Sequence, residues 1–585
     1  MIGALTNLER VIRHTISICP DCQKNIKARI VEDSTSRLVL MRKTCEEHGD
    51  FEDILSKDPD LYQWNHSLVD SIHARMDTAP VNIELENLRN ECPMNCGLCS
   101  QHKSAANLMI VDITNRCNLN CSICYANANN AGHIVEYTYE EIVRIMEHFV
   151  SQKPFFAPVA QFSGGEPTLH PDIIKIIKKA AELPFQHILL NTNGIKMAKS
   201  IEFCRELKQA YPDLALYLSF DGIEPDTYKS IRGVDLSKIK RKVIENCREV
   251  GITGIQLVMT VCKGENDYEV ENILQFAREN NDVVCGIVFQ PVSLCGRITM
   301  EDLRKLRYTN SDLTQEIERV TQGVLKPKDF YPLGASNKLT QLLSWFSDNP
   351  GWAITAHDSC GFATLVQIRP EGGWKPLREY LDVEGMLKWA AEVYEMVHKR
   401  EIPKPTESGL FSSIRELAQK FGRKKIVDTL GGFGDEFTDI AYRNMMKAYF
   451  VIGTLKFIHN LEWKKIIDDK FYLNIFKLLA YPSLRTSKDM LLNGLLFIGS
   501  MHFQDAYNFD VERIQRCVVH YGVLDPDNEN HVLEIPFCTF NTLHREVIER
   551  KWAKTHKKKL EKTPKQQEAE IQELIQDLSQ NFGDK

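Results

Sequence analysis

Hydrophobic residues between positions 108 and 292 gather in six short runs, separated by segments with helical periodicity. In segments such as 138–153, 171–183 and 267–280, apolar residues recur at i, i+3 and i+4, which is typical of amphipathic helices. The six runs are LMIVDIT, VAQFSG, HILLNTN, ALYLSF, GIQLVMTV and VCGIVFQPV. Strands that alternate with helices predict a parallel sheet. Six such units predict an α/β fold, a partial (β/α)6 TIM-like barrel whose strand ends form an open-sided mouth for a site.

Composition is ordinary except for the cysteines. The 585 residues are 43% hydrophobic and 26% charged, and 72 basic against 79 acidic residues give a net charge of −7, which gives no indication of nucleic acid binding. No stretch approaches 18 uninterrupted apolar residues, which excludes a membrane span but not contact with a membrane surface. The N-terminus lacks the pattern of a secretory leader. We therefore expect a cytoplasmic protein whose 17 cysteines are reduced and available to metal.

Three cysteines follow the first predicted strand at the spacing C-x3-C-x2-C. Cys117, Cys121 and Cys124 lie in a loop before helix-like sequence. Three thiolates can hold three irons of a 4Fe-4S cluster, which leaves the fourth iron without a protein ligand. An iron with an open position can chelate a small molecule. A structural metal site is the alternative interpretation of this spacing.

A second triplet with the same spacing precedes the first strand. Because of that position, Cys92, Cys96 and Cys99 cannot share the site at the barrel mouth. We interpret them as ligands of an auxiliary cluster, with His102 or a distant cysteine as the fourth ligand. Zinc is the alternative, because three cysteines and one histidine also suit that ion.

Two knuckles near the N-terminus predict a mononuclear metal site. Cys19 and Cys22 form a C-x2-C knuckle, and Cys45 and His48 form a C-x2-H knuckle beyond an alternating stretch that predicts a hairpin. Zinc is the expected ion and a rubredoxin-like iron the alternative, because tetrahedral sulfur-rich sites hold either metal.

The remaining cysteines differ in their sequence context. Cys204 and Cys247 fall in helical patterns and are expected to be inert core thiols. Four others stand in turn-like or polar stretches and can converge on a third cluster. These four are Cys295, Cys360, Cys517 and Cys538.

These patterns divide the chain into six predicted units. Residues 436–525 are mostly helical in pattern, and the tail carries a basic run followed by an apolar stripe at helical spacing. The units are an N-terminal mononuclear metal-binding module (1–75), an auxiliary iron–sulfur segment (76–107), the barrel (108–300), a mixed connecting region (301–435), a helical C-terminal domain with auxiliary cluster ligands (436–548) and a basic helical tail (549–585).

Strand-end motifs accompany the triplet after the first strand. FSGGEPTLHPDI follows the second strand, NTNG ends the third and SFDG ends the fourth. Each alone is explained as well by the capping of a strand end. Together with C-x3-C-x2-C and the adjacent Tyr125, they resemble the radical S-adenosylmethionine (SAM) superfamily. The SAM contacts that this resemblance implies are Gly164, Gly165 and Glu166 for the ammonium, Asn191 at the third strand, Ser219 and Asp221 for the ribose or methionine end, and Arg232 for the carboxylate.

The chemistry implied by the resemblance explains these residue types. An electron from the cluster cleaves the sulfonium C–S bond of SAM and releases a 5′-deoxyadenosyl radical, which removes hydrogen from carbon. The protein then has to orient SAM and exclude water. No catalytic dyad of side chains is needed, so no catalytic residue is expected beyond the cluster.

Sequences around the other cysteines resemble a narrower family, the archaeal tetraether lipid synthases. The similar stretches are NECPMNCGLCSQH, TNRCNLNCSICYANAN, GSMHFQDAYNFDVERIQRCVVHYG and PFCTFNTLHRE. The resemblance implies three 4Fe-4S clusters, one of which binds SAM, and a rubredoxin-like site. It assigns the SAM cluster to Cys117, Cys121 and Cys124, an auxiliary cluster to Cys92, Cys96 and Cys99, and the third cluster to Cys360, Cys517 and Cys538.

The activity expected from this resemblance is a C–C bond between terminal methyl carbons of two diether lipids such as archaeol, giving a tetraether lipid. The implied partners are an archaeal diether phospholipid, an electron donor such as ferredoxin or flavodoxin, and a membrane surface touched from the cytoplasm. The first alternative is a radical SAM methyltransferase acting on a pterin or similar small molecule, which needs a polar pocket of substrate size. The second is a non-catalytic iron–sulfur carrier, which has no need of the GGEP and SFDG elements.

Overall fold

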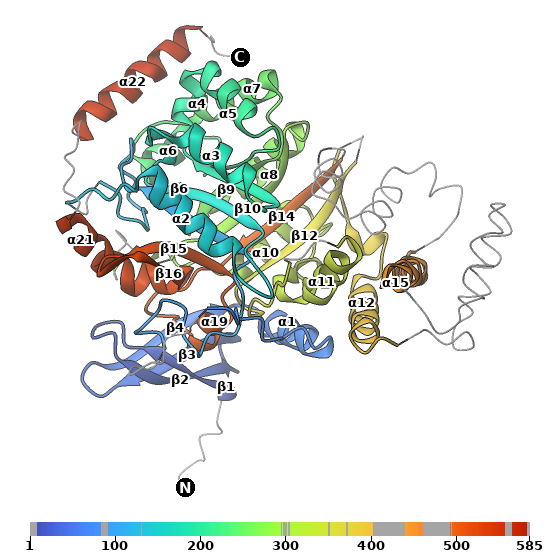
Figure 1. Ribbon diagram of the computed structural model, residues 1–585. Helices are drawn as coiled ribbons and strands as arrows, with labels where there is room; N and C mark the ends of the chain where they lie inside the picture. Colours follow the sequence, from blue (N-terminus) through green and yellow to red (C-terminus); the bar gives the residue numbers. More distant parts are fainter. Residues whose placement is uncertain are drawn as a thin grey trace, which may run out of the picture.

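Two β-sheets organise the protein (Figure 1). The structure is a computed structural model that describes residues 9–83, 92–129, 132–293, 295, 301, 305–348, 352–369, 372–401, 439–459, 492, 494–555 and 564–581. Within these residues, a four-stranded sheet lies at the N-terminus and a twelve-stranded sheet carries the predicted barrel. Parts of the predicted connecting region, helical domain and basic run lie outside the described residues.

The six predicted runs form neighbouring strands of the larger sheet. They are β5 (Leu108–Thr114), β6 (Val159–Gly164), β7 (His187–Thr192), β8 (Ala215–Ser219), β9 (Ile255–Val261) and β10 (Val284–Pro291). Each pairs with the next in parallel. Parallel strands buried on both faces read as near-continuous apolar runs, which explains the sequence pattern. The predicted α/β partial barrel is confirmed.

Helices connect these strands and cover the outside of the sheet (Figure 1). In the first of them, Thr138 accepts a hydrogen bond from the backbone N–H of Glu141, and the Glu141 carboxylate accepts one from the N–H of Thr138. This capping box fixes where the helix begins. The connecting helices are α2 (Tyr139–Val150), α3 (Ile173–Glu182), α4 (Ile195–Lys199), α5 (Ile201–Ala210), α6 (Pro225–Arg232), α7 (Ser237–Val250) and α8 (Val270–Glu279).

Strands from distant parts of the chain extend the sheet at both edges. At one edge β15 (Val519–Asp525) pairs in parallel with β5 and antiparallel with β16 (Asn528–Pro536). At the other, β14 (Leu495–Met501) pairs in parallel with β10 and antiparallel with β12 (Gly361–Ile368). The strand β12 also pairs with β11 (Tyr331–Pro332) and β13 (Trp374–Pro376).

These strands correct the prediction that residues 436–548 form a mainly helical domain. Between 495 and 536 the chain runs mostly as strands of the barrel sheet. The apolar run LLFIGSM is buried on both faces, so it shows no period-2 alternation that distinguishes it from a buried helix. The helical prediction is right for α15 (Asp439–Thr454), which packs against α12 (Val383–His398).

The remaining helices lie around the two sheets. The tail helix α22 (Pro564–Asn581) contacts α7, and Ile571 of its predicted apolar stripe is buried in the barrel core. Among the described helices, we find none whose length and apolar content suit a membrane crossing. The other α-helices of the described residues are α1 (Pro59–Ser71), α10 (Asn310–Val320), α11 (Asn337–Phe346), α19 (Val511–Gln515), α20 (Phe537–Thr539) and α21 (Arg545–Thr555).

The N-terminal sheet assembles the predicted mononuclear site. Cys45 Sγ lies 3.5 Å from His48 Nδ1 and 3.9 Å from Cys22 Sγ, and the four ligand atoms of Cys19, Cys22, Cys45 and His48 all lie within 4.8 Å of one another. This spacing suits a tetrahedral ion. The strands are β1 (Glu9–Ile18), β2 (Asn25–Asp33), β3 (Leu38–Cys45) and β4 (Gly49–Ser56), and the predicted hairpin is β2–β3.

A buried ion pair joins this ribbon to the barrel. Arg307 donates to Asp53 of β4 at 2.6 Å and to Asp505, beyond β14, at 2.8 Å. All three side chains are at most 8% exposed. Burial raises the pKa of Asp53 to about 6, while the charge of Arg307 acts in the opposite direction. The pair therefore depends on both partners being present.

We expect Arg307→Met to destabilise the contact between ribbon and barrel by about 3–5 kcal/mol, because it leaves two buried carboxylates without their cation. Urea unfolding followed by tryptophan fluorescence measures the loss. Arg319→Met, which removes an exposed arginine paired with Glu316, is the matched control and should cost under about 1 kcal/mol. Equal stability of the two variants would show that the buried pair contributes nothing.

A second prediction concerns the ribbon metal. Cys45→Ser should remove about one metal ion per chain, because a tetrahedral site loses one of four ligands. Elemental analysis measures the ion, and the iron–sulfur absorbance should stay unchanged. Cys247→Ser, at a buried core thiol beside Cys204, should retain the ion. Retention of the ion by Cys45→Ser would contradict the four-ligand assignment.

Candidate active site

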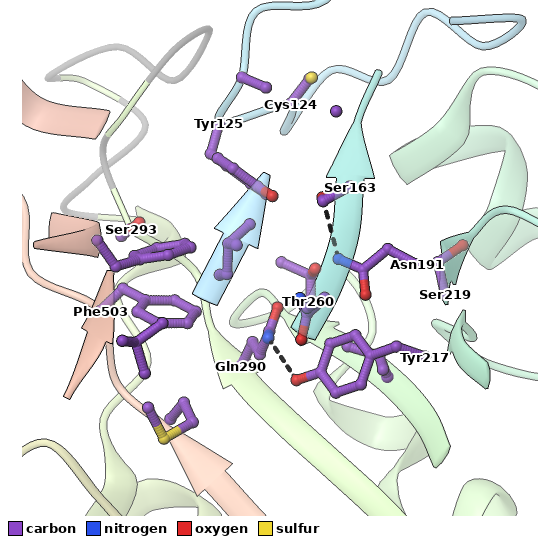
Figure 2. Close-up of a pocket in the computed structure, with 18 of the residues that line it drawn as sticks. Cys124, Tyr125, Ser163, Asn191, Tyr217, Ser219, Thr260, Gln290, Ser293 and Phe503 are labelled. Carbon is purple, nitrogen blue, oxygen red and sulfur yellow. Dashed lines mark hydrogen bonds between the residues drawn. The ribbon is translucent and has the colours of Figure 1, made fainter. Parts of the chain in front are cut away.

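A cavity of about 370 Å³ occupies the interior of the partial barrel (Figure 2). One part of the cavity is formed by the loop after β5 and by the carboxyl ends of β6, β7 and β8. Phe503, Phe537 and Trp352 line it from the segments that extend the sheet. The predicted site residues that line it are Cys117, Cys121, Cys124, Gly164, Gly165, Glu166, Asn191, Ser219 and Arg232.

Asn129 organises the loop that carries the cysteine triplet. Its side-chain amide donates to the backbone carbonyls of Cys117 at 2.8 Å and Leu119 at 3.0 Å, and its carbonyl accepts from the Cys117 N–H at 3.2 Å. Asn129 has a φ of 66°, a left-handed conformation that asparagine tolerates better than most residues. No sequence motif indicated this role, although an asparagine shortly after a cysteine loop is a recognisable turn signal.

The two glycines of the GGEP motif allow β6 to approach this loop closely. A Cβ at Gly164, where φ is 138°, would lie 2.0 Å from the carbonyl oxygen of Thr114. A Cβ at Gly165 would lie 2.3 Å from that of Arg116. Only glycine fits at either position, so the motif is a steric requirement of the site.

Glu166 is held rigidly beside the cysteines. Its carboxylate accepts from Thr192 Oγ1 at 2.8 Å and from the backbone N–H of Asn193 at 2.8 Å, and it also accepts from Thr168. Burial raises the pKa of Glu166, and these hydrogen bonds act in the opposite direction. The side chain is 1% exposed, so its acceptor atoms are fixed in advance of ligand binding.

Asp221 and Arg232 do not occupy equivalent positions. Arg232 lines the cavity, whereas the fully buried Asp221 carboxylate lies behind it and accepts from Arg232 Nε at 2.7 Å and Nη2 at 2.8 Å.

Lys240, which no motif indicated, donates to Asn193 O at 2.6 Å and Ser219 Oγ at 3.1 Å. Burial lowers the pKa of Lys240 to about 7. The contacts predicted between these residues and SAM stay predictions.

A polar wall, of which the sequence indicated only Asn191, lies opposite Tyr125 and Phe503 (Figure 2). Gln290 Nε2 donates to the Tyr217 hydroxyl at 2.9 Å, and Asn191 Nδ2 donates to Ser163 Oγ at 3.1 Å. Figure 2 shows Tyr125 and Phe503 on the other side of the cavity. The position of Gln290 at the end of β10 could have identified it as a site residue, because Asn191 holds the same position at the end of β7.

The triplet of the cavity fits an iron–sulfur cluster. Burial raises the pKa of Cys117 well above its ordinary value, and the neighbouring charges of Cys121, Glu166 and Cys124 raise it further. Three thiolates so placed need a compensating positive charge, which the irons of a bound cluster supply. All three cysteines line the cavity that also holds the GGEP and strand-end residues.

The auxiliary cysteines converge in a separate apolar cluster. Cys92, Cys96, Cys360, Cys517 and Cys538 belong to one apolar cluster with Phe537. Burial raises the pKa of Cys96 well above its ordinary value, with Cys92, Cys99 and Cys517 as charged neighbours. Burial and mutual charge raise the pKa of Cys92 to about 12, with Cys99 as the charged neighbour, and burial raises that of Cys538 to about 11. The structure thus brings the second triplet close to the scattered cysteines, as a pair of adjacent metal sites requires.

The two remaining candidate ligands, Cys295 and His102, lie beside cysteines of this cluster. Cys295 Sγ is buried, 3.6 Å from Thr542 Oγ1, and burial raises its pKa to about 12, with Cys538 as a charged neighbour. His102 Nε2 lies 3.2 Å from the carbonyl oxygen of Cys517. Burial lowers the pKa of His102 to about 3, so the ring is neutral. Their part in metal binding stays a prediction.

Comparisons with known proteins agree with this geometry. The radical SAM superfamily matches residues 111–277, and the HMPTM N-terminal zinc ribbon domain matches residues 11–57. The 7,8-dihydro-6-hydroxymethylpterin dimethyltransferase of Methanocaldococcus jannaschii is 37% identical over 554 residues, which cover 93% of this chain and 98% of that protein.

Other similarities cover smaller parts of the chain. The GTP 3′,8-cyclase of Listeria monocytogenes is 30% identical over 159 residues, 27% of this chain and 45% of that protein. The solved structure of Streptococcus suis SuiB bound to precursor peptide SuiA matches 38% of this chain and 47% of its own with 18% identity and a TM-score of 0.32.

The match over nearly the whole chain corrects the expected activity. The prediction of a tetraether lipid synthase with a diether lipid substrate is wrong. The relative that spans 93% of the chain bears the name of a pterin dimethyltransferase. Cysteine triplets report which metal groups a chain can hold and say little about its substrate. The prediction of 4Fe-4S and SAM cofactors with a further metal in the ribbon is confirmed. The chain belongs to the radical SAM family that includes this Methanocaldococcus jannaschii protein.

Proposed function

We propose that this chain is a radical SAM methyltransferase that acts on a pterin. The observation that carries the proposal is the near-full-length similarity to a protein named as a pterin dimethyltransferase. The cavity supports it, because the SAM-site motifs and a polar wall line the same space inside the barrel. Its volume of about 370 Å³ lies in the usual range for small-molecule sites.

Aromatic side chains on one side of the cavity suit a flat heterocycle. The rings of Phe503 and Phe537 stack with centroids 4.0 Å apart, and Tyr125 lies 5.8 Å from Phe537. Aromatic faces bind planar rings through stacking in addition to burial. A pterin, which is a planar bicycle, therefore fits between this side and the polar wall.

The polar wall suits the amide-like edge of a pterin. Burial raises the pKa of Tyr217, so its phenol stays protonated and able to donate. Among the described residues, the buried Asn191 Oδ1 has no hydrogen-bond partner, so it is an acceptor available to a ligand. Gln290 carries both a donor and an acceptor beside Tyr217. Such a site discriminates by leaving its polar groups unpaired when the wrong molecule binds.

The chemistry divides between bound groups and protein. A 4Fe-4S cluster and SAM supply the one-electron cleavage of a sulfonium bond when they are bound. The chain holds the cluster through Cys117, Cys121 and Cys124, and it offers Glu166 and Asn191 as fixed acceptors inside a buried cavity. An external one-electron donor of the ferredoxin or flavodoxin class is the partner that this proposal requires.

The reconstituted protein, given dithionite, SAM with a deuterated methyl group and 7,8-dihydro-6-hydroxymethylpterin, should place labelled methyl groups on the pterin. Mass spectrometry detects the label, and chromatography detects 5′-deoxyadenosine. Cys121→Ala should lower both products to background, because the cluster loses a ligand. Formation of 5′-deoxyadenosine without any labelled pterin would refute the substrate while leaving the enzyme class intact.

Gln290→Leu should lower kcat/KM for the pterin roughly tenfold to hundredfold, because a buried polar group of the substrate loses its partner. Cleavage of SAM without pterin should change little, because Gln290 makes no described contact with the cysteine loop. Gln275→Leu, at an exposed glutamine paired with Glu279, is the matched control. An unchanged kcat/KM in Gln290→Leu would exclude the polar wall as the substrate contact.

A further inference from the structure

The contact between Arg232 and a cysteine of the SAM-site triplet is not explained by binding of SAM. Arg232 Nη1 lies 3.6 Å from Cys121 Sγ, which is hydrogen-bond distance for a sulfur acceptor. At the same time Nε and Nη2 donate to the two carboxylate oxygens of Asp221. One planar guanidinium therefore links a buried carboxylate to a candidate cluster ligand.

Several contacts fix this guanidinium in place. Asp221 also accepts from the backbone N–H of Thr260 at 3.2 Å, and this second hydrogen bond restrains the carboxylate. The cysteine loop is tied to the end of α6, because the N–H of Ser122 donates to Ile231 O at 3.3 Å. Gly233, with φ of 81°, ends that helix directly after Arg232. The distance between Arg232 and Cys121 is thus set from both sides.

The charge of Arg232 is maintained despite burial. The Arg232 side chain is 14% exposed and pairs directly with Asp221, and an arginine side chain stays charged in proteins. A fixed cation that donates N–H to a cluster sulfur stabilises the more negative, reduced cluster over the oxidised one. The direction of the effect follows: the reduction potential rises.

We propose that Arg232 is a positioning residue for the iron–sulfur site, held by Asp221 so that it donates to Cys121 and raises the reduction potential of the cluster bound by Cys117, Cys121 and Cys124. The step that Arg232 affects is the reduction of the cluster, which would accept one electron from dithionite or a ferredoxin-class donor. Arg232 neither gains nor loses a proton in that step. This role holds whichever substrate the enzyme takes, so it does not rest on the pterin proposal.

Reductive titration of the reconstituted full-length protein without SAM tests this role. Electron paramagnetic resonance follows the signal that changes when SAM is later added, which identifies the cluster of the cavity among the others. Two variants are compared with wild type. Arg232→Lys keeps the positive charge but lacks the planar guanidinium that donates to Asp221 and Cys121 at once. The double variant Asp221→Asn/Arg232→Met removes both charges of the pair, so neither partner is left as an unpaired buried charge.

Both variants should show a lower midpoint potential than wild type while they retain iron and sulfide. Arg248→Met, which breaks a two-point pair with the exposed Asp282 and removes no described contact with the cysteines of the cavity, should leave the potential unchanged. A wild-type potential in both loaded variants would overturn the proposal. A change in SAM affinity alone would make Arg232 a contact of the SAM carboxylate instead, and failure of both variants to bind the cluster would make it an assembly residue.

Discussion

The site depends on how closely the end of β6 approaches the cysteine loop. Backbone N–H groups of Gly165 and Glu166 donate at 2.8 Å to the carbonyls of Thr114 and Arg116 at the start of that loop. Any side chain in place of either glycine of the motif would collide with those same carbonyls. This backbone contact places a buried carboxylate beside three thiols before any cofactor binds. The barrel strands supply the rigidity that keeps the two segments in register.

Charge balance is the second condition that the site meets. Glu166 and Asp221 are buried carboxylates, Arg232 pairs directly with Asp221, and the buried Lys240 donates to Asn193 O. Buried charges are tolerated only when they are paired and hydrogen-bonded. These residues come from the ends of β6 and β8 and from the helices α6 and α7, so four separate segments of the chain have to act together. For the same reason, a short sequence motif does not predict which hydrogen-bond or ion-pair partner each of its side chains has.

The auxiliary cysteines depend on the extension of the barrel sheet. The N–H of His502, just beyond β14, donates to Cys360 O at 2.9 Å, and the N–H of Gln504 lies 3.3 Å from Cys538 Sγ. The strand β15 follows Cys517 and pairs with β5, which itself leads into the cavity triplet. The same strands therefore bring both metal regions together. Phe537, which stacks in the cavity wall, lies next to Cys538 and joins the two regions.

The sequence by itself determined the barrel, the ribbon and the kinds of metal group that the chain can hold, because hydrophobic periodicity and cysteine spacing are local properties of the chain. It misread 495–536, since an apolar run buried on both faces carries no period, and its lipid substrate was wrong because metal motifs do not encode a substrate. Only the tertiary structure decided that Asp221 faces Arg232, that Gln290 meets Tyr217 and that Lys240 reaches Ser219. These contacts join residues from different strands and helices, and their geometry exists only once the sheet has formed.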